Sequence, residues 1–192
     1  MSFMNFNLHT WELFWGNILL MVCCLFYLAW WIVAFHPNTP SKGLQTGLLL
    51  AAATAAGIAA VVLTVKGMRA IPHEAKLFPT NSILWGGIAA YFVLLAVTSL
   101  FFKRQVTTEL ILIVGWAMME MSEIDALYGA GRFGLKAAVI LSVVIGFAAV
   151  ISLICYVLYY RLELTAGYID GMVPLIILPL VMAGISVTMA VL

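Results

Sequence analysis

The chain has 192 residues, of which 65% are hydrophobic and only 9% are charged, and its formal net charge is +1. Soluble globular domains contain about 45–50% apolar residues, so this composition excludes a soluble domain. A balanced charge without a basic patch also excludes nucleic acid as an expected partner.

Six long apolar runs follow one another along the chain. A helix of about 20 apolar residues crosses the hydrocarbon core of a bilayer, and backbone that faces lipid must satisfy its own hydrogen bonds. We therefore predict an all-α integral membrane protein: a single transmembrane domain over residues 1–192, built as a bundle of six transmembrane helices with short connections. The predicted spans are approximately 11–35, 44–65, 81–102, 106–130, 135–160 and 168–191.

The first span is rich in aromatic residues, with Trp11, Trp15, Trp30 and Trp31 near its two ends. This pattern is typical of anchoring at the membrane interface, and an aromatic pore lining is the alternative. The segment before it, Met1–Thr10, contains no Lys or Arg, so we expect a retained span rather than a secretory signal.

The second span is rich in small residues, which recur four apart at Ala52, Ala56 and Ala60. Such a face lets two helix backbones approach closely. We expect these alanines to pack against another helix at the centre of the bundle or at a contact between subunits. Membrane lipids and either further copies of the chain or a partner membrane subunit are the expected partners.

The fourth span carries the sharpest chemical signal, because Glu120, Glu123 and Asp125 lie inside an apolar run. An acid at the centre of a membrane helix costs roughly 2.5–3.5 kcal/mol on insertion scales, and it marks a functional site by default. At 100° per residue, Trp116, Glu120 and Glu123 fall on one stripe about 60° wide, whereas Asp125 points nearly opposite.

Two carboxylates three residues apart on a helix cannot both ionise cheaply in a low dielectric. A proton or a cation shared by Glu120 and Glu123 resolves this conflict, and a proton-coupled carrier or a cation path requires such a site. Whether carboxylate oxygens here also bind a metal is unknown from the sequence. The structural alternative is that the acids lie at the membrane interface, where Arg132 and Lys136 neutralise them.

The sixth span adds Asp170, followed by Gly171 and Pro174. A polar residue beside a helix-interrupting proline resembles the broken helix ends that line solute paths in transporters. The six-span topology places Asp170 in the opposite half of the membrane from Glu120, so the two mark separate stations of one path or are unrelated.

These features favour a membrane transport protein, a channel or carrier for a small polar or cationic solute that is proton-linked through buried carboxylates. The alternatives are a non-catalytic assembly subunit of a larger membrane complex and, more remotely, a metal-dependent intramembrane enzyme. The sequence lacks a phosphate-binding loop and a helical His-Glu-x-x-His, so it favours a protein without catalytic residues or a cofactor.

The orientation is nearly balanced. Five basic residues fall on the side of the N-terminus and four on the other side, which weakly favours a cytoplasmic N-terminus. We expect a multi-pass protein of a bacterial or archaeal cytoplasmic membrane.

Overall fold

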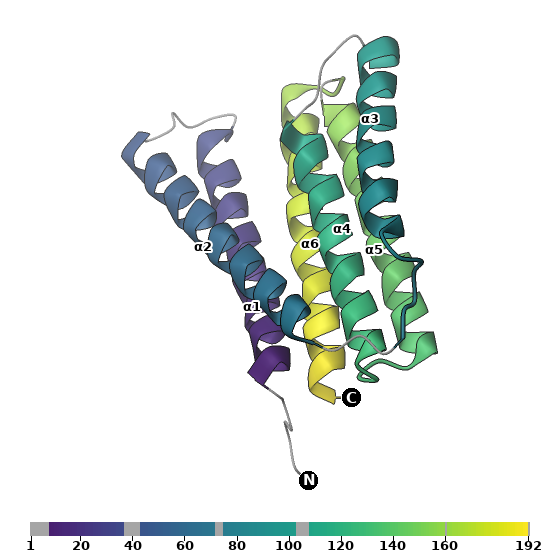
Figure 1. Ribbon diagram of the computed structural model, residues 1–192. Helices are drawn as coiled ribbons and strands as arrows, with labels where there is room; N and C mark the ends of the chain where they lie inside the picture. Colours follow the sequence, from purple (N-terminus) through teal and green to yellow (C-terminus); the bar gives the residue numbers. More distant parts are fainter. Residues whose placement is uncertain (1–7, 37–42, 72–74, 103–107, 160, 192) are drawn as a thin grey trace.

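The protein is an all-helical bundle over the residues that the computed structural model describes, which are 8–36, 43–71, 75–102, 108–159 and 161–191 (Figure 1). The helices are α1 (Leu8–Ala34), α2 (Gly43–Ala70), α3 (Ser82–Phe102), α4 (Thr108–Gly129), α5 (Leu135–Tyr159) and α6 (Leu164–Val191). The predicted fold class is confirmed, with each helix overlapping one predicted span.

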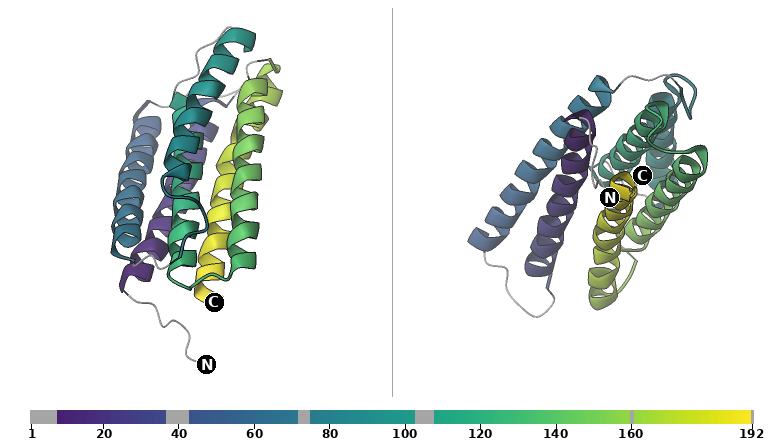
Figure 2. Two further views of the ribbon diagram at one scale, coloured as in Figure 1. Left: turned by 45° about the vertical axis from the view of Figure 1, so that its right-hand side comes forward. Right: turned by 90° about the horizontal axis from the view of Figure 1, so that it is seen from below.

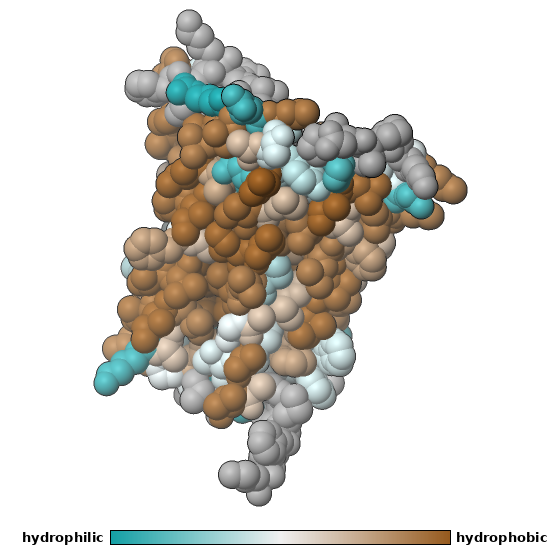
Figure 3. Space-filling view, turned by 180° about the vertical axis from the view of Figure 1, so that it is seen from behind, coloured by the Kyte–Doolittle hydropathy of each residue, from teal (hydrophilic) through white to brown (hydrophobic). Residues whose placement is uncertain are grey.

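Five of these helices, α1, α2, α3, α5 and α6, are long and apolar enough to cross a membrane. The remaining helix, α4, has 22 residues and runs beside them, and its acids set it apart from the other five (Figure 1). Large apolar side chains are exposed over the outer surface, and apolar colour covers most of the middle of the face in Figure 3. A surface of this kind is stable against lipid and unstable in water, so the chain is a multi-pass membrane protein.

Helix α1 begins three residues before its predicted span, and two other helices extend further beyond theirs. Helix α2 continues to Ala70 rather than ending near residue 65, because the long side chains of Lys66 and Arg69 can reach polar surroundings from a helical backbone. Helix α6 begins at Leu164 rather than near residue 168. Asp170 therefore lies six residues inside α6, about 9 Å from its first residue at 1.5 Å per residue.

The helices alternate in direction, so α1 begins and α6 ends on the same side of the bundle, called the lower side below (Figures 1 and 2). Helices α1 and α2 form a hairpin, and α1 also packs along α6, which joins the hairpin to α3–α6. The hairpin is tight where Gly16 meets Thr64: a Cβ on Gly16 would collide with the Thr64 hydroxyl.

The buried core lies between α1, α4, α5 and α6. Its largest fully buried apolar side chains are Leu13, Leu110, Ile124, Leu127, Ile145, Met182 and Ile185. Three carboxamide or carboxyl groups share this interior, and they define the candidate site.

Candidate functional site

The acidic stripe of α4 faces the inside of the bundle. Glu120 and Glu123 are each only 1% exposed, and Trp116, one turn before Glu120, is 7% exposed. All three belong to the stripe predicted from helical spacing. The apolar residues Leu127 and Ile124 surround the lower end of the stripe and are fully buried. The carboxyl groups are therefore enclosed by protein and do not lie on the lipid-facing surface.

Glu123 has a polar partner on another helix. The Asn17 side-chain amide of α1 donates a hydrogen bond to Glu123 Oε1 at 2.6 Å, and Asn17 itself is 1% exposed. The same amide lies 3.5 Å from the Leu13 carbonyl, one turn earlier in α1. Because an asparagine amide donates and cannot accept at nitrogen, it holds the Glu123 carboxyl in one orientation.

Glu120 is the less satisfied of the two acids. Neither of its carboxyl oxygens has a hydrogen-bond partner among the described residues, and the Trp116 indole N–H also lacks one. Buried polar atoms are nearly always hydrogen-bonded, so each exception calls for an explanation such as a water or an ion. The interior of the bundle thus contains two carboxyl oxygens and one N–H donor without partners, on side chains one helical turn apart.

Glu120 lies well before the lower end of its helix. Helix α4 ends at Gly129, nine residues after Glu120, which corresponds to about 13 Å along the helix. Asn17 likewise lies nine residues from the start of α1. Both helices thus bring their polar groups to a similar level, far inside the lower end of the bundle.

Asp125 is separate from this pair. Its Oδ1 accepts hydrogen bonds from the backbone N–H groups of Leu77, at 2.7 Å, and Phe78, at 3.1 Å. Asp125 therefore fixes the segment that leads into α3. The opposite placement of Asp125 and the Glu pair on α4 agrees with the helical spacing. Its immediate partners are these backbone donors.

Asp170 lies near the upper end of α6, beside α5. Cys155 of α5 lies beside the Asp170 carboxyl, whose Oδ2 is buried and has no partner among the described residues. Pro174 lacks an N–H group, so the Asp170 backbone carbonyl loses its usual helical donor. Trp31 of α1 packs against Gly171 and donates its indole N–H to the Tyr168 carbonyl at 3.2 Å.

The alanine stripe of α2 is partly enclosed. Ala60 is fully buried, whereas Ala52 and Ala56 are half-buried. One turn away, Gly57 approaches α1 so closely that a Cβ there would lie 3.1 Å from Cys23 Sγ. The small residues of α2 thus pack within the hairpin.

Sequence reasoning missed Asn17 and the buried serines Ser152 and Ser186, whose hydroxyl oxygens have no partner among the described residues. A single asparagine in a long apolar helix is as unusual as an acid, so Asn17 was detectable from its surroundings. Serine is common in membrane helices, and its position alone carries little information.

The buried polar groups around Glu120 suit a proton better than a metal ion. Within the described part of the chain, no group of three or more His, Cys, Asp or Glu side chains is placed to hold a metal ion. Calcium and magnesium usually take six or more oxygen ligands, whereas two carboxyls and one amide supply fewer, and an indole N–H cannot coordinate a cation. A proton, or a cation that keeps most of its water, suits the pair better.

Comparisons with protein family models, with curated proteins and with solved structures give no match for this chain.

Proposed function

We propose that the chain is a membrane transport protein for a small polar or cationic solute, in which Glu120 takes up and releases a proton. The observation that carries the proposal is the Glu120 carboxyl: it is 1% exposed and both of its oxygens lack a described partner. Burying a polar group without a hydrogen-bond partner costs free energy, and intramembrane acids of this kind typically serve proton or ion paths.

The two acids have different parts in this proposal. Glu123 is held by Asn17 through a 2.6 Å hydrogen bond and acts as a fixed charge or acceptor beside the exchanging group. Glu120 has no such restraint and is free to bind a proton or a hydrated cation. Asp170 and Cys155 form a second polar station about 9 Å inside the upper end of α6.

The burial of the acids also bears on the alternative of an assembly subunit. Acids that bridge to a neighbouring chain need exposure on the outer surface, whereas Glu120 and Glu123 are enclosed by their own bundle. The metal-dependent enzyme receives no support from the ligand set. A transport function accounts for the buried polar groups without requiring a partner chain or a metal ion.

The test is proton flux into liposomes that contain the purified chain, followed with an enclosed pH-sensitive dye. Glu120→Gln keeps the shape and polarity of the side chain and removes its exchangeable proton, so we expect flux to fall to the level of empty liposomes. Glu163→Gln is the matched control, because Glu163 is exposed outside the helices. Equal flux in the wild type and in Glu120→Gln would overturn the proposal.

A further inference from the structure

A second site lies on the lower side of the bundle, away from the buried acids. A pocket of about 370 Å³ opens between the end of α2, the segment 75–81, the start of α3 and the outer face of α4. Its polar lining consists of Arg69, Lys76, Thr80, Asn81, Ser122 and Asp125. Neither Glu120 nor Glu123 lines this pocket, so it is separate from the site of the proposed function.

The pocket favours an anion. Arg69 and Lys76 supply two positive charges, and Lys76 Nζ is oriented by a 3.0 Å hydrogen bond to Thr80 Oγ1. The single acid, Asp125, already accepts two backbone N–H bonds through Oδ1. Helix α3 begins at Ser82, and a helix N-terminus carries a partial positive charge that favours phosphate.

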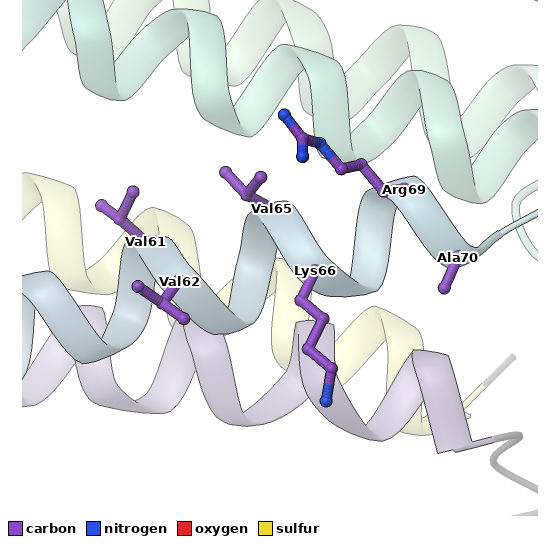
Figure 4. A pocket seen from close by; sticks show the side chains of 6 residues that line it. All are labelled: Val61, Val62, Val65, Lys66, Arg69 and Ala70. Carbon is purple, nitrogen blue, oxygen red and sulfur yellow. The ribbon is translucent and has the colours of Figure 1, made fainter.

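An apolar trough continues from this pocket along α2. It has a volume of about 500 Å³ and shares Val65 and Arg69 with the polar pocket. Figure 4 shows Val61, Val65 and Arg69 extending from one side of α2. Lys66, which also lines the trough, extends from the other side of α2 and forms a 2.6 Å ion pair with Glu12 of α1, so its charge already has a partner.

A cationic pocket joined to an apolar trough at the membrane surface matches one class of molecule. We infer that this groove binds an anionic phospholipid, with its phosphate between Arg69, Lys76 and the start of α3 and an acyl chain along Val61 and Val65. A free phosphate would use the polar pocket and leave the trough unused. A zwitterionic lipid would fill the trough without the net charge that the two cations complement.

Native mass spectrometry of the full chain in detergent tests this inference. Delipidated protein is titrated with phosphatidylglycerol or with phosphatidylcholine of the same acyl chains. We expect tighter binding of phosphatidylglycerol, and Arg69→Gln or Lys76→Gln should weaken it roughly fivefold each, which corresponds to about 1 kcal/mol per basic residue near a membrane surface. Lys136→Gln is the control, since Lys136 is an exposed cation at the start of α5, also on the lower side, that lines neither pocket.

Three results would overturn the inference. Equal binding of the two lipids would show that the charge is not recognised. Equal weakening by Lys136→Gln and Arg69→Gln would show a diffuse surface effect. Competition by glycerol phosphate as effective as that of the lipid, with no effect of the trough-filling change Val61→Phe, would assign the pocket to a free phosphate.

Discussion

Asn17 of α1 and Glu123 of α4 are 106 positions apart in sequence and joined by a 2.6 Å hydrogen bond in the interior of the bundle. This bond links the α1–α2 hairpin to the acid-bearing helix. The bond also makes the two glutamates different, because Glu123 has a hydrogen-bond partner and Glu120 has none among the described residues.

Removing the amide should destabilise the fold through Glu123. In Asn17→Leu the buried Glu123 carboxyl loses its donor, and an unsatisfied buried polar group costs about 1–3 kcal/mol. We expect the free energy of unfolding to fall by about that amount, measured by denaturant titration in mild detergent.

The double variant Asn17→Leu with Glu123→Leu provides the control for that prediction. Replacing both partners with apolar groups removes the unsatisfied atom, so most of the lost stability should return. Strictly additive losses in the double variant would mean that the two residues are not energetically coupled.

Asp125 should act through its acceptor oxygen. In Asp125→Ala, Leu77 and Phe78 lose the carboxylate that accepts their N–H groups, and we expect faster hydrogen exchange of the segment 75–81. Asp125→Asn keeps an acceptor oxygen and removes the charge, so exchange and proton flux should both stay near the wild-type values. Loss of flux in Asp125→Asn would instead place this residue on the transport path.

Gly16 should tolerate no side chain. A Cβ at this position collides with the Thr64 hydroxyl and lies 3.2 Å from the Thr64 backbone nitrogen, which cannot move without displacing α2. We expect Gly16→Ala to lower the free energy of unfolding by about 1–3 kcal/mol, as overpacking usually does. Gly115→Ala, where nothing lies within 4 Å of the new Cβ, should be nearly neutral in the same measurement.

The sequence was sufficient to predict a helical membrane protein, because apolar runs long enough to cross a bilayer are rare in soluble proteins. Helical spacing also predicted that Glu120 and Glu123 share a face and that Asp125 lies apart. It did not predict Asn17 as the partner of Glu123, because the relative rotation of α1 and α4 depends on packing across the whole bundle. The distance of Glu120 and Glu123 from the end of α4 could not be predicted either. The sequence places the last residue of a helix only to within about one turn.

The hydrogen bonds between Asp125 and the segment before α3 could not be predicted from the sequence either. Its donors are backbone N–H groups, which every residue except proline carries, so no side-chain pattern marks them. The donors to Asp125 Oδ1 belong to Leu77 and Phe78, which lie 48 and 47 positions earlier in the chain.

Asp170 should contribute to flux as a second station. In Asp170→Asn the group keeps its size and polarity, but it no longer exchanges a proton. If the buried Oδ2 and the backbone carbonyl released by Pro174 form one end of the path, flux in liposomes should fall several-fold while thermal unfolding stays unchanged. Cys155→Ser, which keeps a small polar side chain beside Asp170, should retain flux. Wild-type flux in Asp170→Asn would confine the path to the Glu120 site and leave Asp170 as a structural acid near the upper end of α6.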